Sequence, residues 1–491
     1  MTNPLLTYLE IKLEKITVKL PIENILLNPF YRISKGTPEQ LRQYTILHGK
    51  YSYALVSCRL LLNVLIAPLK ILSYILFSII YRDSSANFCK LIVRSDVIFL
   101  SHALEGSLNL SPKDQFYGDQ PSIIASKCKV SIVYTNHFRT NYKSKSDLLL
   151  RKIPNVQGLL IPKFLSPLEN YQYLRTMFKL IYQSFRTLLL SKDINYKDRN
   201  ILLLGISKTF SRATYSNYLL QVYLLKVLTL SHCNSLILTL EGHSYENLLY
   251  KLIESKGLPI KCIYYQHSPT VLGHIGIKTF LKSIQKPLEI LTTGPIYSTY
   301  LSQLAPHHKY SVVGSMKFSR HLQSNDKVVK QRILFTPEGT NLHSIEFIKL
   351  ASTLSRVLPN YEVAIRFHPN LRQGFKLRFL IIKMKYQKNF SVSKLSLIED
   401  LHESKYVVFR SSAVGVETLT GNSIPLFVSD EKFKDLNVFS IFPESPFPSL
   451  QKNSLIDFIS KPTEVDISKF AFYYLQMLAP VNKAQWEVAL M

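Results

Sequence analysis

The sequence predicts two α/β domains, each built on a parallel β-sheet, that follow a mainly helical N-terminal region. A chain of 491 residues suits two or three domains. From about residue 92 onward, short apolar runs alternate with amphipathic segments, which is typical of strands alternating with helices. The runs are apolar throughout, as expected for strands covered by helices on both faces. Ligands of such sheets bind beyond the C-terminal ends of the strands.

The composition indicates a folded, strongly basic protein. Hydrophobic residues make up 46% of the chain and charged residues 19%, so a large core can be buried. The net charge of +27 favours an anionic partner, such as a nucleic acid, an acidic membrane surface, a sugar nucleotide or an acidic polysaccharide. The sequence has no zinc-finger, recognition-helix or RNP-type pattern, so we expect no nucleic-acid partner. The five cysteines are dispersed without paired spacing, which indicates a reducing compartment and neither disulfides nor a zinc site.

Residues 1–90 are helical in pattern and contain one long apolar stretch. The first residues lack the pattern of a secretory signal. Residues 60–81 are apolar enough to cross a bilayer, but Pro68 and Lys70 stand near the middle, where a charge is costly. This favours two short helices that meet at Pro68, packed as a buried hairpin. Attachment to a membrane surface and a true membrane span are the alternatives.

The first α/β domain is expected over residues 91–280. Glycines and a proline near residues 275–290 interrupt the pattern there and suggest the domain boundary. Ser166 and Glu169 have the spacing of a capping box at the start of one long helix. We expect strands at 96–102, 130–134, 235–240 and 260–265, and helices at 167–190, 210–230 and 245–256.

The second α/β domain is expected over residues 281–440, followed by a helical tail over 441–491. Its alternation of strands and helices is more regular than that of the first domain. We expect strands at 288–293, 310–313, 332–336, 362–367, 406–409 and 424–428, and helices near 297–304, 347–358, 398–403 and 414–420.

Two motifs at predicted strand ends suggest a site for a phosphorylated ligand. In the run Arg366-Phe367-His368-Pro369, the arginine offers a permanent positive charge and the histidine a donor to phosphate or a nucleobase. In the run Arg410-Ser411-Ser412, serine hydroxyls precede a helix whose first N–H groups can bind an anion. Either motif alone can equally be structural, as a strand-ending turn or a helix cap.

Two further residues belong to the same predicted crevice. Glu417, one helical turn beyond the serines, offers a carboxylate to ribose hydroxyls, although a surface glutamate is the plain alternative. Gly339 follows another strand of the same sheet and would complete the floor of the crevice. We therefore expect donor-binding residues at Arg366, His368, Pro369, Arg410, Ser411, Ser412, Glu417 and Gly339.

A third motif, Glu241-Gly242, follows a predicted strand of the first domain. Together with His368-Pro369 and Ser411-Ser412, it resembles the motifs of the GT-B glycosyltransferases of bacterial surface polysaccharides, a group that includes bacterial sialyltransferases and capsule enzymes. The resemblance extends over residues 241–428. It implies two Rossmann-like domains facing across a cleft, a histidine that contacts the nucleotide and a serine pair that binds its phosphate.

The resemblance also implies that the carboxylate of the acidic motif is the general base. In this sequence Leu240 stands where the group has a first acidic residue, so the base is left open. Glu241 and His267 are the predicted catalytic residues, and Glu246 and His243 are nearby alternatives. A useful base would have its pKa raised toward neutrality by partial burial.

The sequence contains no Asp-x-Asp motif, so we expect transfer without a metal or a cofactor. The predicted function is transfer of a sugar from a nucleotide-sugar donor to a surface polysaccharide or glycolipid, with a CMP-activated sugar as one candidate donor. A sugar-nucleotide epimerase and a non-catalytic binding subunit on the same fold are the alternatives. We expect a cytoplasmic protein at the inner face of the membrane, with a nucleotide-sugar donor and a carbohydrate or glycolipid acceptor as partners.

Overall fold

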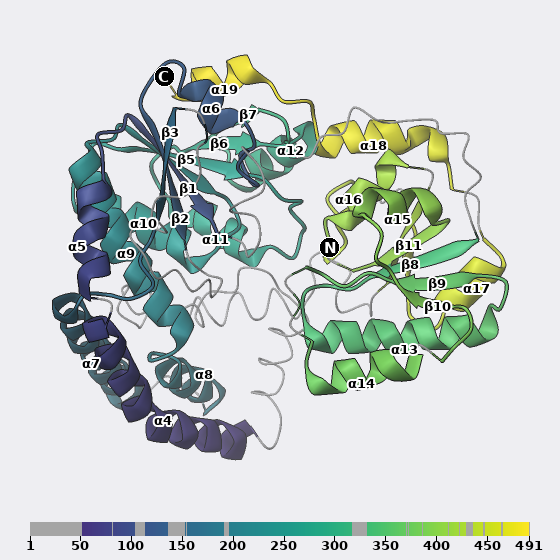
Figure 1. Cartoon of the computed structure of the whole chain (residues 1–491), viewed down its shortest axis with the longest axis horizontal. Helices are drawn as coiled ribbons and strands as arrows, with labels where there is room; N and C mark the ends of the chain where they lie inside the picture. Colours follow the sequence, from purple (N-terminus) through teal and green to yellow (C-terminus); the bar gives the residue numbers. More distant parts are fainter. Residues whose placement is uncertain are drawn as a thin grey trace.

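The chain folds into two α/β domains, as predicted (Figure 1). This confirms the predicted GT-B class of fold, with two Rossmann-like domains and helices at the N-terminal side. Predictions for residues 1–51 and for Ser411 lie outside the described residues. The computed structural model describes residues 52–80, 82–103, 113–135, 153, 155–190, 196–316, 331–369, 371, 373–384, 386–410, 412–421, 423–428, 436–444, 447–462 and 465–490.

The first domain is built on a seven-stranded parallel sheet with the strand order β3-β2-β1-β4-β5-β6-β7. Ile98 of β1 pairs with Ser131 of β2 on one side and with Leu236 of β4 on the other. The order therefore reverses between β1 and β4, and this is the switch point of the sheet. The strands are β1 Val97–His102, β2 Val130–Thr135, β3 Val156–Leu160, β4 Ser235–Thr239, β5 Lys261–Gln266, β6 Glu289–Thr292 and β7 Lys309–Val312.

The second domain is built on a six-stranded parallel sheet with the strand order β10-β9-β8-β11-β12-β13. Its switch point lies between β8 and β11, where Phe335 pairs with Val408. The strands are β8 Arg332–Thr336, β9 Glu362–Ile365, β10 Phe390–Val392, β11 Tyr406–Phe409, β12 Ile424–Val428 and β13 Ser449–Leu450.

Helices cover both faces of each sheet, which explains why the strands are apolar throughout. In β1, Ile98 and Leu100 face one apolar cluster while Val97 and Phe99 face another.

The predicted capping box at the start of α7 is confirmed, because the Ser166 N–H donates to Glu169 and the Glu169 N–H donates to the Ser166 hydroxyl. The helices from α6 to α16 are α6 Gln120–Ile124, α7 Pro167–Leu190, α8 Tyr196–Ser207, α9 Arg212–Ser231, α10 Ser244–Ser255, α11 Ile275–Ser283, α12 Pro295–Leu304, α13 Asn341–Val357, α14 Phe375–Met384, α15 Leu397–Glu403 and α16 Val414–Glu417.

The N-terminal helices differ from the predicted buried hairpin. A single helix, α4 (Ser52–Ile80), runs through Pro68, and α5 (Arg82–Leu91) follows it. A proline inside a helix removes one hydrogen bond, and tertiary packing can offset that loss. Here Tyr74 stacks on Tyr215 of α9 at 4.2 Å between ring centroids. The opposite side of α4 is exposed, and residues Leu61–Ile80 are long and apolar enough to cross a membrane.

The boundary between the domains lies later than the predicted position between residues 280 and 281. Strands β6 and β7 pair with β5 and therefore belong to the first sheet. The chain changes sheets between Val312 and Arg332. Gly273 lies in the turn before α11, and Gly276 lies in the first turn of α11, where its backbone closely approaches Gly242.

The predicted C-terminal tail is divided between the two domains. Helix α17 (Leu455–Ser460) packs on the second sheet, and α18 (Phe470–Met477) packs on the same domain beside α12. The chain then returns to the first domain, where Trp486 of α19 (Lys483–Leu490) contacts Tyr265 at 5.0 Å between ring centroids. Figure 1 shows α18 and α19 along the top of both domains. This segment therefore joins the two domains.

Candidate functional site

The candidate site is formed where each sheet reverses its strand order. Ligands of parallel sheets bind beyond the carboxyl ends of the strands at such switch points. In the first domain His102 ends β1, and Glu241 follows the adjacent strand β4. In the second domain Gly339 follows β8, and Ser412 follows the adjacent strand β11. The topology thus supports the placement of the sequence motifs at ligand-binding edges.

Glu241 is the centre of the first-domain half of the site. Its Oε2 lies 2.6 Å from Nε2 of His243, and its Oε1 lies 2.9 Å from Nε2 of His267. The side chain of His243 is 40% exposed, whereas that of His267 is 7% exposed. One carboxylate therefore orients two imidazoles, one open to solvent and one enclosed. The structure thus brings together Glu241, His243 and His267, three residues that the sequence offers as candidate bases.

The turn that positions Glu241 depends on its two neighbours. Glu246, on the first turn of α10, accepts the backbone N–H of Glu241 at 2.9 Å and that of Gly242 at 2.8 Å. Gly242 has a φ of +74°, and a Cβ at this position would lie 2.3 Å from the backbone nitrogen of Ile277. A side chain at Gly242 would be both strained and blocked by α11. The glycine of the motif thus has a structural cause.

Glu241 and Glu246 lie close together, but their pKa values shift in opposite directions. Burial disfavours the charged form of Glu241, but the imidazoles of His267 and His243 outweigh this and hold its pKa well below the ordinary value of 4.5. Burial raises the pKa of Glu246 to about 8. Glu241 therefore lacks the raised pKa that a useful base would have, because two hydrogen-bonded imidazoles face this carboxylate.

His267 has one ring nitrogen that is bound and one that is not. Its Nδ1 is buried and has no hydrogen-bond partner within the described part of the chain, while Nε2 faces Glu241. The ring of Phe116 meets the imidazole edge-on at 4.8 Å between centroids. A carboxylate on one ring nitrogen fixes the tautomer and leaves the other nitrogen as an acceptor.

Sequence reasoning missed a second group of polar residues at this switch point. His102 Nδ1 lies 2.6 Å from the Thr135 hydroxyl, and His102 Nε2 lies 3.0 Å from the Tyr245 hydroxyl. The ring of Tyr245 also stacks on His243 at 5.5 Å. The sequence signal was available, because His102 and Thr135 both end predicted strands. What was not visible is that β1 and β4 are neighbours in the sheet.

The second-domain half of the site lies at the N-terminus of α13. Thr340 caps this helix, with its hydroxyl accepting the N–H of His343 at 3.3 Å. His368 is exposed and faces Gly339, where an added Cβ would lie 3.2 Å from His368 Nδ1. Pro369, the next residue, is also exposed. A 17-residue helix that points its free N–H groups toward an exposed histidine can bind an anion.

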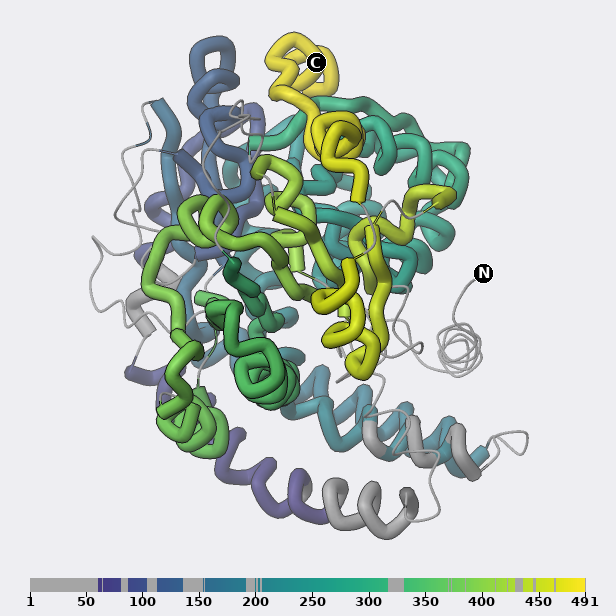
Figure 2. The backbone as a smooth tube through the Cα atoms, turned by 90° about the vertical axis from the view of Figure 1, so that its right-hand side faces the viewer, coloured from purple at the N-terminus to yellow at the C-terminus, as the bar shows by residue number. Residues whose placement is uncertain are grey.

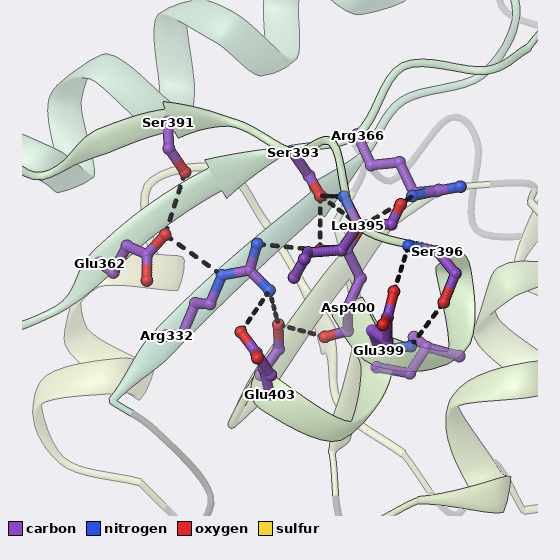
Figure 3. Close-up of polar contacts among 12 residues, drawn as sticks. Arg332, Glu362, Arg366, Ser391, Ser393, Leu395, Ser396, Glu399, Asp400 and Glu403 are labelled. Atoms are coloured by element: carbon purple, nitrogen blue, oxygen red, sulfur yellow. Dashed lines mark hydrogen bonds and ion pairs between the residues drawn. The ribbon is translucent and has the colours of Figure 1, made fainter.

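Arg366 is engaged inside the second domain. Figure 3 shows its guanidinium beside Asp400, which it contacts at 2.9 Å, and it also donates to the backbone carbonyl of Leu395. Asp400 is fully buried and also pairs with Arg332 at 2.9 Å. A buried carboxylate is costly unless cations compensate it, and Arg366 is one of the two cations that do so. These contacts argue against the predicted role of Arg366 in binding the donor.

Arg410 is also engaged inside the domain. Its side chain is 2% exposed, donates to Glu346 of α13 at 3.3 Å, and lies over the ring of Phe347 at 5.5 Å. Its Nε also donates to the carbonyl of Val428. The charge of Arg410 holds α13 against β11 and β12. Its burial and its contacts with Glu346 and Val428 argue against the predicted contact of Arg410 with a donor phosphate.

Ser412 and Glu417, which are both predicted to contact the donor, lie at the predicted crevice. The Ser412 hydroxyl accepts the N–H of Val414 at 3.3 Å, which is the ordinary role of a serine before a helical turn. The helix that follows, α16, has only four residues. Glu417, its last residue, is partly buried. Their contact with a donor stays a prediction.

The two halves of the site belong to segments that pack on each other. Val271, in the loop that follows β5 and His267, shares one apolar cluster with Val416 of α16 and Leu419 beyond it. The edge of the first sheet that carries Glu241 and His267 is thus next to the second-domain loop that carries Ser412. Within the described residues, no group of three or more histidine, cysteine, aspartate or glutamate side chains has the geometry of a metal site.

No family model matches the chain, and no curated protein matches it. Among solved structures, it resembles the glycotransferase of kitacinnamycin with 10% identity and a TM-score of 0.46, over 81% of this chain and 100% of that one. It also resembles a UDP-GlcNAc 2-epimerase from Methanocaldococcus jannaschii, with 12% identity and a TM-score of 0.44, over 80% and 98% of the two chains. An α,α-trehalose-phosphate synthase (UDP-forming) from Burkholderia vietnamiensis follows with 9% identity and a TM-score of 0.42, over 81% and 92%. At this level of similarity the function rests on the site residues alone.

Proposed function

We propose that this protein is a glycosyltransferase that takes a sugar from a nucleotide-sugar donor. The observation that carries the proposal is the Glu241 carboxylate that holds two imidazoles at the switch point of the first sheet, beside a second domain with an anion-binding helix end. In such a transfer the acceptor hydroxyl oxygen attacks the anomeric carbon. The bond from that carbon to the phosphate oxygen breaks, and the electron pair leaves with the nucleotide. The acceptor proton passes to a base on the enzyme.

His243 suits the role of the base better than Glu241. A carboxylate with a pKa well below 4.5 is a weak base at neutral pH. An imidazole has an ordinary pKa of about 6.5, close to the working range. His243 is 40% exposed and is oriented by Glu241, so an acceptor hydroxyl can reach the imidazole but not the enclosed ring of His267. Glu241 then orients the base and stabilises it when protonated.

The leaving phosphate would be stabilised at the N-terminus of α13. Because Arg366 and Arg410 are bound to Asp400 and Glu346, neither arginine supplies this charge. The helix N–H groups beyond Thr340, together with His368, are donors that this edge offers. Transfer by this arrangement requires no metal. A CMP-activated sugar as donor and a surface polysaccharide or glycolipid as acceptor remain part of the proposal, on the strength of the motif resemblance.

A sugar-nucleotide epimerase is the second candidate. Two imidazoles beside one carboxylate also suit the removal and return of a proton at a sugar carbon. The products distinguish the two reactions, because transfer releases free nucleotide and forms a glycoside, whereas epimerisation gives an isomer that is still bound to the nucleotide.

The test begins with donor binding. Thermal unfolding in the presence of CMP, CDP, UDP and GDP identifies the nucleotide, because a ligand that binds only the folded state raises the melting temperature. The matching sugar nucleotides are then incubated with the full chain and glycan acceptors, and the products are separated. Release of nucleotide with formation of a glycoside supports the proposal. Donor binding without any turnover would instead indicate a binding subunit.

A further inference from the structure

Three helices, α4, α7 and α14, expose apolar side chains, and α7 and α14 also expose cations. Two of them, α4 and α7, belong to the first domain and pack against each other, and the third, α14, belongs to the second domain. In Figures 1 and 2, α4 and α14 both lie along the lower edge of the molecule, on the side away from α18 and α19. We refer to the exposed sides of α4, α7 and α14 as the lower face.

Helix α4 contributes the most apolar part of the lower face. Its inner side is fixed to the first domain by Ala67, Ile71 and Tyr74, which pack on the core cluster. The other sides are exposed to solvent along much of the helix. The exposed fractions include 64% for Leu65, 67% for Leu69, 52% for Leu72, 50% for Leu76 and 68% for Ile80.

Helices α7 and α14 both expose aromatic residues. On α7 the exposed residues include Tyr171, Tyr182 and Leu189, at 64%, 68% and 78%. On and just beyond α14, Phe375, Phe379 and Tyr386 are 88%, 60% and 86% exposed. The inner residues Leu377, Ile381 and Met384 bind α14 to its domain core, so the aromatic residues point away from it.

The charges on these helices are almost entirely positive. Helices α4 and α14 contain no acidic residue, and the single acid of α7, Glu169, is buried against Lys226. The exposed cations are Arg175, Lys179 and Arg186 on α7 and Lys376, Arg378 and Lys383 on α14.

We propose that the lower face binds the surface of an anionic lipid bilayer through helices of both domains. Exposed leucines and aromatic rings flanked by lysine and arginine are typical of helices that lie in the membrane interface. Acidic lipid headgroups attract such cations near the membrane surface. A second copy of this chain would place two positive faces against each other, which opposes association. Because α4 is fixed to the core on one side, it lies along the bilayer and does not cross it.

The first test is binding of the full chain to lipid vesicles by flotation. Vesicles of phosphatidylcholine with about 30% phosphatidylglycerol are compared with vesicles of phosphatidylcholine alone. We expect binding to the acidic vesicles to be stronger by about tenfold or more, and to weaken as salt is raised to about 0.5 M. Equal binding to both vesicles without salt dependence would overturn the proposal. So would retention in the membrane after an alkaline carbonate wash, because the helix would then span the bilayer.

The second test separates the contributions of the two domains. The variants F379E/Y386E on the α14 side and Y182E/L189E on α7 replace residues that are at least 60% exposed, so the fold should be retained. Each pair should lower the affinity for acidic vesicles by about tenfold or more. The matched control is F472E/V488E on α18 and α19, on the opposite edge, where the residues are 56% and 58% exposed. The control should bind like the parent.

Two outcomes would contradict the proposal. If the α14 variant binds vesicles as well as the parent, the second domain takes no part in the footprint. If the control loses as much binding as the other variants, the effect reflects net charge and not the lower face. Neither assay requires a donor or an acceptor, so the result is independent of the proposed enzymatic function.

Discussion

Nε2 of His243 lies 2.6 Å from Oε2 of Glu241, while Nε2 of His267 lies 2.9 Å from Oε1 of the same carboxylate. The sequence motif implies that Glu241 is the base, but in this geometry its carboxylate orients two imidazoles, and we propose one of them as the base. A carboxylate that accepts hydrogen bonds from two imidazoles is a poor proton acceptor, but it orients both rings. The exposed ring of His243 then becomes the group that a substrate hydroxyl can meet.

The first prediction concerns turnover. His243→Asn and Glu241→Gln should each lower kcat by about 10²–10⁴-fold, because the first removes the proposed base and the second removes the group that orients it. The affinity for the donor nucleotide should remain within about threefold of that of the parent, since donor contacts are placed on the second domain. Steady-state kinetics and nucleotide titration measure the two quantities.

The matched control is Glu254→Gln on α10, a partly exposed acid that pairs only with surface lysines. It should leave kcat unchanged. Full activity in the His243 variant together with a loss in His267→Asn would assign the base to the enclosed imidazole, contrary to our proposal. Full activity in all of them would place the chemistry elsewhere.

Much of the fold could be predicted because its strands are short apolar runs that end in polar residues. The bounds of α7 and of strand β8 agree with the prediction to the residue. Strands β3 and β10 and helices α8 and α14 were missed. Helix α14 exposes aromatic residues and buries other apolar residues, so its apolar residues are not confined to one face of the helix. The domain boundary was misplaced because glycines were interpreted as a linker when they mark a close backbone contact.

The site was predictable in position but not in the partners of its charges. Sequence spacing places Arg366 and Arg410 at strand ends, and a strand end is where a ligand binds. Whether a guanidinium turns outward or inward depends on distant residues, here Asp400 and Glu346. The same limit applies to His102, whose link to Tyr245 depends on β1 lying beside β4.

The second prediction concerns the buried carboxylate Asp400. Asp400→Asn should lower the free energy of unfolding by about 3–5 kcal/mol, because Arg332, whose side chain is 3% exposed, would keep its charge without a full counter-charge. Glu399→Gln is the control in the adjacent position, since glutamine still completes the capping box of α15. Urea denaturation of both variants measures the difference. An equal, small effect of the two substitutions would show that the cluster around Asp400 is not a structural centre.

The third prediction compares two glycines with the same backbone strain. Gly242 and Gly257 have φ values of +74° and +59°, but only Gly242 is crowded, with Ile277 backbone atoms in the place of a Cβ. Gly257→Ala should therefore cost about 1–2 kcal/mol from the left-handed conformation alone. Gly242→Ala should cost clearly more and should also lower kcat, because the turn carries Glu241. Equal costs measured by thermal unfolding would contradict the close contact between this turn and α11.

The fourth prediction concerns stability in acid. The imidazoles hold the pKa of folded Glu241 well below 4.5, so the unfolded state binds protons more readily than the folded state. The resulting stabilisation is present above pH 4.5 and is lost as the pH falls toward the folded pKa. Glu241→Gln should thus destabilise the protein at neutral pH, and the difference from the parent should shrink in acid. A difference that stays constant down to about pH 3 would contradict the lowered pKa.

The fifth prediction concerns Glu246, for which the sign is opposite. Burial raises the pKa of this group from 4.5 to about 8, so the folded state binds a proton more tightly than the unfolded state. The stabilisation from this proton is complete below pH 4.5 and is lost as the pH rises through about 8. Glu246→Gln removes the titration but also weakens acceptance of the backbone N–H groups of Glu241 and Gly242, so it should destabilise the protein at every pH. The informative quantity is the change with pH in the difference between the free energies of unfolding of the parent and the variant. Between about pH 5 and pH 9, urea denaturation should show that the parent loses stability relative to the variant. A constant difference would show that Glu246 stays ionised and that the two backbone hydrogen bonds outweigh its burial.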